Sequence, residues 1–185
     1  MKKSVPETRQ RERPQRGGGR RRMQFREPEE FEQRMIDLAR VTRVMAGGKR
    51  MRFRACVVIG DRKGRVGWGV AKGADVSLAI QKAVAQAKKN LITVSIVDGT
   101  IPHQVLVKYH AARLMLKPAK EGNGLIAGGV VRTVLDLAGV QNIVSKMFGS
   151  PNKINNVGAT FKALGMLRRV ESPAKNKATA EAVTT

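Results

Sequence analysis

The sequence of 185 residues contains one cysteine and two histidines. A single cysteine excludes a disulfide framework, and together with two histidines it cannot supply the four ligands of an ordinary structural zinc site within one chain. Cys56 lies in an apolar run, which favours a small buried side chain over a reactive thiol. These shortages fit a reducing compartment, and no metal site is expected.

Long apolar runs are also missing, and aromatic residues make up only 4% of the chain. No segment approaches the roughly 20 apolar residues that span a membrane, and the charged N-terminus lacks the apolar core of a secretion signal. Four glutamates between residues 27 and 32 weaken the alternative of an Arg-rich, acid-poor mitochondrial presequence. With one Trp, one Tyr and five Phe, an aromatic platform for stacking bases is poorly supported.

Acidic residues are few: 14 Asp and Glu stand against 36 Lys and Arg, for a net charge of +22. A soluble domain seldom needs more than about 8 net charges for solubility, so the surplus predicts a polyanionic partner. Nucleic acid fits best, with an anionic membrane or an acidic protein as alternatives. The surplus is not confined to the termini, because residues 54–170 hold 18 basic residues and five acids.

The residues of an active site are not found. His103 and His110 have no acid near them beyond Asp98, no pair of acids has a useful spacing, and no phosphate-binding loop of the G-x-x-x-x-G-K-[ST] type occurs. The stretch EGNGLIAGG (residues 121–129) has the G-x-G-x-x-A spacing of a dinucleotide-binding loop. However, no Asp or Glu between Asp136 and Glu171 is available to hold the ribose, and hairpin signals precede the loop. We expect a glycine turn that opens a helix, no catalytic residues and no cofactor; attraction of an anion to the N-terminus of that helix is left open as an alternative.

Patterning in the first half predicts strands followed by a helix. Alternating apolar residues indicate strands over 41–45, 51–59 and 66–70, joined by glycine-containing turns. Glycines between Val66, Trp68 and Val70 indicate close approach by another backbone or by a packed helix on one sheet face, and basic side chains are expected on the opposite, uncovered face. An amphipathic helix is predicted from the N-cap Asp75 to Leu91. Before these elements, residues 1–22 predict a disordered basic arm, and residues 27–41 a linker with some helical character.

The second half predicts another strand-and-helix unit. Strands are expected over 91–97, 104–109, 112–118 and 142–148. One helix is predicted over 128–137 with Gly139 as its stop, and a second is predicted to begin at Ser150-Pro151. Residues 171–185 predict a frayed tail. A compact sheet-plus-helix unit with basic turns suits the backbone and shape of folded RNA better than a major groove of DNA.

Residues 48–71, GKRMRFRACVVIGDRKGRVGWGVA, resemble the signature of the bacterial small-subunit ribosomal protein five family. The runs GLIAGGVVRTVLDLAGV (124–140) and FGSPNKINNV (148–157) resemble its second domain. The resemblance covers roughly residues 36–167. It implies an α+β protein with an N-terminal sheet and helix like double-stranded-RNA-binding domains, followed by a C-terminal α/β sandwich-type ribosomal domain. The division implied is 1–35 (arm and linker), 36–100 (RNA-binding-like domain), 101–168 (C-terminal domain) and 169–185 (flexible tail).

The resemblance also implies a function. It indicates a non-enzymatic, cytoplasmic, ribosome-bound constituent of the small subunit that supports assembly and decoding accuracy. The implied partners are ribosomal RNA, the fourth and eighth small-subunit proteins, and a place beside the path by which messenger RNA enters; no membrane is expected. The expected RNA-binding residues are Arg43, Gly47, Gly48, Lys49, Arg50, Arg52, Arg54, Arg62, Lys63, Arg65 and Lys72.

Two further positions follow from the resemblance. The loop at residues 45–50 corresponds to the family's contact with RNA of the head, linked to spectinomycin response, but Ala46 stands where family members commonly carry Lys. The region from Gly122 to Arg132 resembles the surface facing the fourth protein, with Gly122, Gly124, Gly128 and Arg132 as candidate contacts. The alternative function is a free-standing, chaperone-like protein that binds RNA or DNA.

Overall fold

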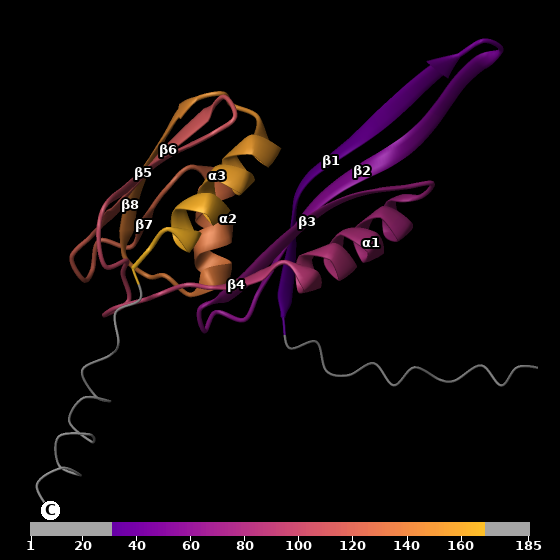
Figure 1. Cartoon of the computed structure of the whole chain (residues 1–185). Coiled ribbons are helices and arrows are strands. Elements are labelled where there is room, and N and C mark those ends of the chain that lie inside the picture. The colour runs from indigo at the N-terminus through magenta and orange to yellow at the C-terminus, as the bar shows by residue number, and fades with distance from the viewer. Residues whose placement is uncertain (1–30, 169–185) are drawn as a thin grey trace, which may run out of the picture.

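The computed structural model describes residues 31–168, which form two four-stranded sheets and three helices (Figure 1). The first unit contains β1 (Glu32–Met45), β2 (Gly48–Gly60), β3 (Arg65–Gly73), α1 (Val76–Lys89) and β4 (Leu91–Thr93). The second contains β5 (Val105–Tyr109), β6 (Ala112–Pro118), β7 (Leu125–Ile126), α2 (Gly129–Ala138), β8 (Ile143–Gly149) and α3 (Lys153–Gly165). The α+β class predicted from the sequence is confirmed. The predicted arm and tail lie outside the described residues.

The first sheet is antiparallel in the order β1-β2-β3-β4, and α1 covers one of its faces. Three alanines of α1, every fourth residue from Ala79 to Ala87, are fully buried against Ala55, Val57 and Ile59 of β2. Small residues let the helix approach closely, since a side chain at Gly67 or Gly69 of β3 would strike the backbone of α1. The packing predicted from these alternating glycines is confirmed. Asp75 is the N-cap of α1, although its side chain makes no capping hydrogen bond.

The prediction of helical character for residues 27–41 is wrong within the described part, because β1 begins at Glu32. The expected domain boundary at residue 36 falls inside this strand, at a β-bulge between Met35 and Asp37. The polar start of β1 has no apolar alternation that would indicate a strand. Its conformation is set by pairing with the apolar end of β2, where Glu32 lies opposite Gly60 and Met35 opposite Val57.

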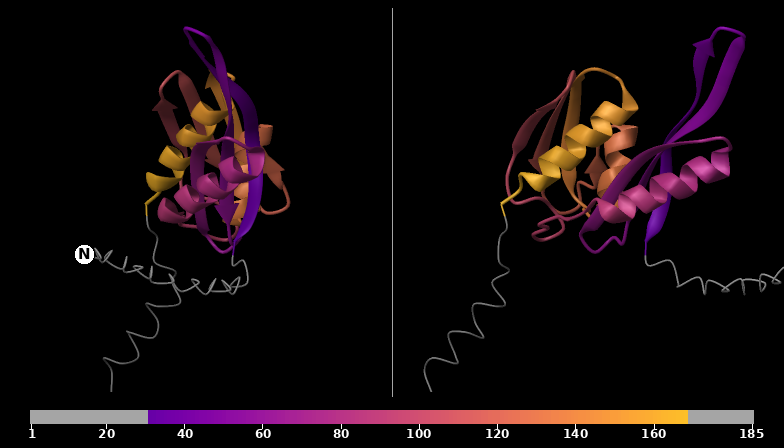
Figure 2. Two further views of the ribbon diagram at one scale, coloured as in Figure 1. Left: turned by 90° about the vertical axis from the view of Figure 1, so that its right-hand side faces the viewer. Right: turned by 45° about the vertical axis from the view of Figure 1, so that its right-hand side comes forward.

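In the second unit, β5, β6 and β8 are antiparallel neighbours, while β7 pairs in parallel with β8. Both α2 and α3 lie on the sheet face that is turned toward the first unit (Figure 2). The strands predicted over 104–109 and 112–118 are confirmed. The one predicted over 91–97 is only three residues long, and it belongs to the first sheet because β4 pairs with β3. No helix within residues 31–168 has the length and apolarity to cross a membrane.

The ends of the two helices test the predicted caps. Gly139 ends α2 in the left-handed conformation with φ 88°, as predicted. The predicted start of α3 at Ser150 is wrong by two residues, because Asn152 is the N-cap and its side-chain oxygen accepts from the backbone N–H of Ile154 at 3.0 Å. Ser150 has a different role: its hydroxyl accepts from the backbone N–H of Asn152. Ser150 and Asn152, on either side of Pro151, are both suitable N-cap residues, and the sequence pattern favoured the wrong one.

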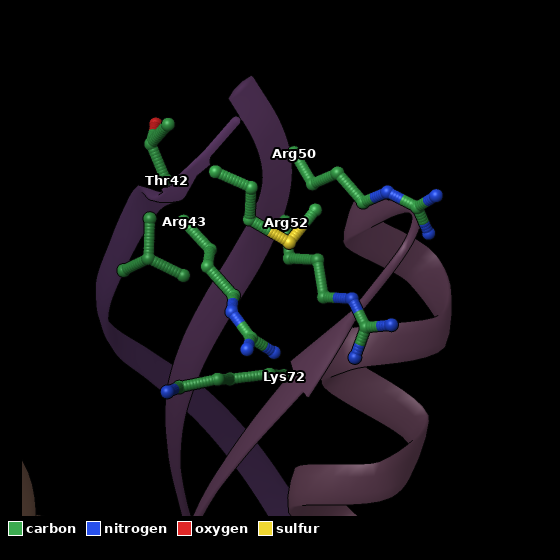
Figure 3. Close-up of a pocket in the computed structure, with 7 residues that line it drawn as sticks. Thr42, Arg43, Arg50, Arg52 and Lys72 are labelled. Carbon is green, nitrogen blue, oxygen red and sulfur yellow. The ribbon is translucent and has the colours of Figure 1, made fainter. Parts of the chain in front are cut away.

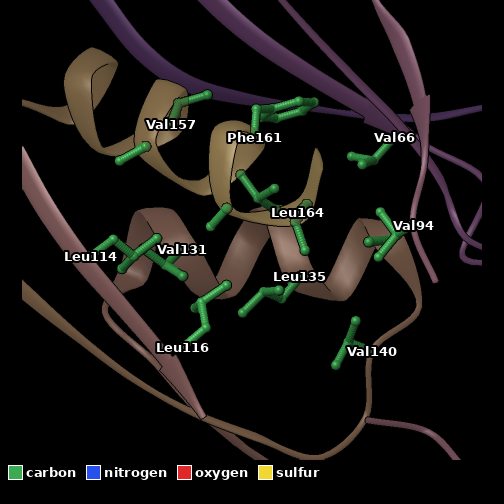
Figure 4. Packing of buried hydrophobic residues seen from close by; sticks show 14 of the residues in the cluster. Val66, Val94, Leu114, Leu116, Val131, Leu135, Val140, Val157, Phe161 and Leu164 are labelled. Atoms are coloured by element: carbon green, nitrogen blue, oxygen red, sulfur yellow. The ribbon is translucent and has the colours of Figure 1, made fainter. Parts of the chain in front are cut away.

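One apolar core joins the two units. Cys56, Val58 and Val66, on the face of the first sheet away from α1, belong to the same buried cluster as the inner faces of α2 and α3. Figure 4 shows Val66 and Val94 of the first unit beside Phe161, Leu164 and Val140 of the second. The expectation that this sheet face is uncovered is therefore wrong at the base of the sheet. Buried on both faces, the end of β2 reads as the continuous apolar run ACVVI, and Cys56 is 1% exposed as predicted.

Candidate nucleic-acid interface

The hairpin of β1 and β2 extends well beyond α1 and the second unit (Figures 1 and 2). Residues 42–52 are all exposed, so neither sheet face of this extension is covered by residues 31–168. Met45 pairs with Gly48, which leaves a two-residue turn of Ala46 and Gly47. Gly47 and Gly48 have φ of 89° and 142°, values that other residues rarely adopt, and nothing lies within 4 Å of the position of a side chain there.

The strand register gathers four cations on one face of the hairpin. Arg43 lies opposite Arg50, and Arg52 follows Arg50 by two residues, so all three side chains leave the same face. Lys72 of β3 shares this face because it lies opposite Arg54, the next residue in the same alternation. We call Arg43, Arg50, Arg52 and Lys72 the hairpin basic face. Figure 3 shows them around a surface pocket of about 320 Å³, which Val41, Thr42 and Met45 also line.

The cations of the hairpin basic face have no counter-ion in the part of the chain that the structure describes. Within residues 31–168, none of the four lies within 4.0 Å of a carboxylate oxygen. Arg54, deeper on the same face, differs: its guanidinium lies 3.6 Å from Asp37, which also accepts a hydrogen bond from Lys153 of α3 at 3.2 Å. Uncompensated like charges that converge on one surface attract a polyanion, because each neutralised phosphate releases a condensed counterion.

Lys49 was predicted with this group, but it projects from the opposite face of the hairpin, where it lies opposite Val44. Its position next to the turn still exposes it. The remaining predicted cations are Arg62 and Lys63 in the β2–β3 turn and Arg65 at the start of β3. They lie at the far end of β2, on the order of 30 Å from Arg50 along an extended strand. The structure therefore divides the predicted RNA-binding residues between two ends of one strand.

Two of the three cations at the β2–β3 turn, Arg62 and Arg65, form ion pairs within the chain. Arg62 forms an ion pair with Glu32 at 2.8 Å, and Arg65 pairs with Asp61 at 2.7 Å and covers the ring of Phe31. Burial raises the pKa of Asp61, but hydrogen bonds from the Arg65 side chain and from two backbone N–H groups outweigh burial and leave that pKa below its usual value. Only Lys63 of this turn has an exposed side chain without a carboxylate partner among the described residues.

This turn also docks on the second unit. The backbone N–H of Arg62 donates to the carbonyl of Leu137 at 3.0 Å, and that of Gly64 donates to the carbonyl of Ala138 at 2.9 Å. These are carbonyls of the last turn of α2, which lack partners inside the helix. The glycines and cations of residues 60–65, which read as a binding turn in the sequence, thus include contacts that hold the two units together.

The sequence did not predict the ion pairs that connect the first unit to the second. Arg34 pairs with Asp136 of α2 at 3.1 Å, and Asp37 joins Arg54 to Lys153 of α3. The pairs Arg34–Asp136 and Asp37–Lys153 join residues more than 100 positions apart in the chain, so no local spacing could have indicated them. Val41, Thr42 and Met45, which line the pocket, had a weak signal in the alternation of apolar and basic residues along the hairpin.

The glycine stretch 121–129 forms a loop around β7. Gly122 and Gly124 have φ of 89° and 66°, and the N–H of Gly124 donates to the side-chain oxygen of Asn142 at 3.0 Å. Gly128 is the N-cap of α2 and lies against Met147, while Arg132 is exposed on the helix. β7, α2 and β8 form one short parallel crossover that hairpin signals did not predict. Its strand lies inside the G-x-G-x-x-A motif instead of before it, so the glycines are not placed as in a dinucleotide site.

Comparison with protein families gives two matches. A domain model described as "Ribosomal protein S5, N-terminal domain" matches residues 31–95, which span the first sheet and α1. A second, described as "Ribosomal protein S5, C-terminal domain", matches residues 107–177, which include nearly all of the second unit. The two matches follow the same order along the chain as the two units.

Proposed function

Because the chain belongs to the ribosomal protein S5 family, which its two domain matches establish, we propose that the hairpin basic face is its principal contact with the backbone of ribosomal RNA. Proteins of this family are structural constituents of the small ribosomal subunit that bind ribosomal RNA and other ribosomal proteins, and the chain is such a constituent. The protein is accordingly ribosome-associated.

One observation carries the assignment: three arginines of an exposed hairpin and Lys72 of the neighbouring β3 leave one sheet face, and none of the four pairs with a carboxylate in residues 31–168. An ion pair inside the chain would have to be broken or shared before a phosphate could bind. The hairpin cations need no such exchange. By this criterion Arg54, Arg62 and Arg65 contribute less to RNA affinity than the hairpin basic face, and Lys63 is the cation of the β2–β3 turn that is ready to bind.

The tip of the hairpin fits close approach to a sugar-phosphate backbone. Gly47 and Gly48 carry no side chain and are exposed beside Lys49 and Arg50, so a phosphate can approach the backbone there closely. Backbone N–H groups are frequent donors to phosphate oxygens. Ala46 stands where family members commonly carry a lysine, and Lys49 and Arg50 are the nearest cations that can contact the phosphate in its place. No exposed aromatic ring lies on residues 42–52, so the contact reads backbone and shape in preference to bases.

The identity of the protein partners is a second part of the proposal. We infer contacts to the fourth and eighth small-subunit proteins, with Gly122, Gly124, Gly128 and Arg132 toward the fourth, and a position beside the path by which messenger RNA enters. The loop of residues 121–124 is exposed except for Gly124, and Arg132 projects from the following helix. We infer that the contact with the fourth protein gives the chain a role in decoding accuracy. We propose no enzymatic role for it.

Sedimentation of ribosomal particles tests the proposed contact. Cells that express only the Arg43→Gln, Arg50→Gln, Arg52→Gln variant should yield small subunits that lose the protein at a lower salt concentration than the wild type. A matched variant, Lys82→Gln, Lys88→Gln, Lys89→Gln, removes three exposed cations of α1. Equal retention of the hairpin variant and the wild type across a salt series would overturn the assignment.

A further inference from the structure

The second sheet has an outer face that neither helix of its unit covers. In Figures 1 and 2, α2 and α3 lie between this sheet and the first unit, and the opposite face is turned away from the rest of the described chain. The strand register identifies the nine outward side chains, which we call the outer face: Leu106, Lys108, Arg113, Met115, Lys117, Ile126, Val144, Lys146 and Phe148.

Five of these nine residues are large and apolar, whereas the solvated face of a sheet normally carries polar residues, which alternate along each strand with buried apolar ones. Leu106 is 69% exposed, Ile126 53% and Phe148 45%. Leu106 lies directly opposite Met115, and Ile126 lies directly opposite Val144. Val144 is a diagonal neighbour of Met115, because it lies two residues before Lys146, the residue opposite Met115. The apolar residues therefore form a stripe across all four strands. Contiguous exposed apolar surface of this kind marks an interaction site on a soluble protein.

The remaining four residues of the outer face are all cations. Lys108 lies directly opposite Arg113 on neighbouring strands, a like-charge pair that destabilises an isolated sheet. Lys146 lies opposite Met115, and Lys117 lies opposite Val144, so cations border the apolar stripe on each side. No carboxylate occupies any outward position of the three long strands, and none of these cations lies within 4.0 Å of a carboxylate in residues 31–168.

We propose that the outer face is a docking surface for another protein of the small subunit, one that presents aliphatic side chains flanked by carboxylates. The cations alone would also suit RNA. However, a sugar-phosphate backbone would cover Leu106, Met115 and Ile126 without any apolar partner, whereas aliphatic side chains of a protein bury them. Carboxylates at the border would relieve the repulsion between Lys108 and Arg113. The proposal rests on membership of the small subunit, and its surface is separate from the hairpin basic face.

A photo-crosslinking amino acid at position 106, introduced into the full chain and assembled into small subunits, tests the proposal. We expect an adduct with one ribosomal protein, at a segment that contains both aliphatic residues and carboxylates. Adding Lys108→Glu and Arg113→Glu should lower the yield of that adduct about tenfold, since it places like charges against the partner. The same photo-reactive residue at Leu78, an exposed apolar position on α1, is the control and should not give this adduct.

Several outcomes would contradict the proposal. An adduct with ribosomal RNA would reassign the outer face to nucleic acid, an adduct within the chain or with a second copy would assign it to the protein itself, and no adduct would show that solvent covers it. Each of these results leaves the RNA-binding hairpin intact. Failure of the chain to enter small subunits would instead contradict the function on which the proposal rests. Circular dichroism of each free variant checks that it is folded.

Discussion

Arg43 lies directly opposite Arg50 in the register of β1 and β2, so two guanidinium groups leave neighbouring positions of one exposed sheet face. Like charges directly opposite each other destabilise an isolated sheet, by about 0.2–1 kcal/mol. The hairpin therefore carries a local repulsion that a bound phosphate removes. This relationship predicts that stability and RNA binding respond in opposite directions to the same substitution.

Arg43→Gln should leave the free energy of unfolding of the free protein unchanged or raise it by up to about 1 kcal/mol, while it weakens binding to small-subunit ribosomal RNA. Urea denaturation measures the first quantity, and filter binding at fixed salt measures the second. A variant that loses both stability and affinity would indicate that Arg43 supports the hairpin structurally.

Gly139 holds the junction between the two units. Its φ is 88°, and an added side chain would strike the backbone carbonyl of Arg62. We expect Gly139→Ala to lower the free energy of unfolding by more than about 2 kcal/mol, from the left-handed conformation together with displacement of the β2–β3 turn. Gly129→Ala, at a position with nothing within 4 Å, is the control and should change stability by less than about 0.5 kcal/mol. Equal effects of the two substitutions in urea denaturation would refute this role.

Cys56 should be unreactive until the protein unfolds. Burial raises the pKa of its thiol to about 11, from a usual value of 9.0, so the thiolate is scarce at neutral pH and shielded as well. Iodoacetamide at pH 8 should modify the native protein far more slowly than the protein in concentrated urea. Comparable rates in the two states would contradict the observed packing.

The same thiol predicts a pH dependence. Because the pKa is raised in the folded state, the unfolded chain releases the proton first as the pH rises. The stabilisation is complete below about pH 9 and is lost as the pH passes 11, an effect of about 2–3 kcal/mol at most. Cys56→Ala should remove this part of the decline, which urea denaturation between pH 8 and 11 can measure against the wild type.

Asp37 joins the base of the hairpin to the second unit through Arg54 and Lys153. Its side chain is 21% exposed, so its loss leaves the half-buried Arg54 without its carboxylate partner. Asp37→Asn should lower the free energy of unfolding by about 1–2 kcal/mol, and less at 1 M NaCl because salt screens the pairs. A stability unchanged at every salt concentration would show that packing alone sets the position of the hairpin.

Local patterning predicted those elements whose side chains alternate in a regular way. The strands β2, β5 and β6 and the end of α2 at Gly139 were predicted because apolar periodicity and glycine stops are encoded within a few residues. The first half of β1 was not, since its polar residues become a strand only by pairing with β2.

For the candidate site, the sequence predicted the residues but not the sheet face that each side chain occupies or the ion pairs that it forms. Sequence reasoning named every member of the hairpin basic face, but only the register shows that Lys49 leaves the other face and that Lys72 joins Arg43. The partners of Arg54 and Arg62 lie 17 and 30 residues earlier in the chain, so their ion pairs could not be inferred from local spacing, whereas Asp61, the partner of Arg65, is only four residues away. Likewise, the burial of both faces of β2 depends on docking of the second unit.

The salt dependence of RNA binding tests the central claim most directly. The logarithm of the association constant of the full chain for small-subunit ribosomal RNA should be measured against the logarithm of salt concentration for the wild type, for Arg43→Ala, Arg50→Ala, Arg52→Ala, and for Lys82→Ala, Lys88→Ala, Lys89→Ala. Both variants lose three charges, so net charge alone predicts the same result for each. We expect a slope about 2–3 units shallower for the hairpin variant, which is about one unit for each lost phosphate contact, and a slope close to that of the wild type for the α1 variant. Equal slopes for the two variants would contradict it.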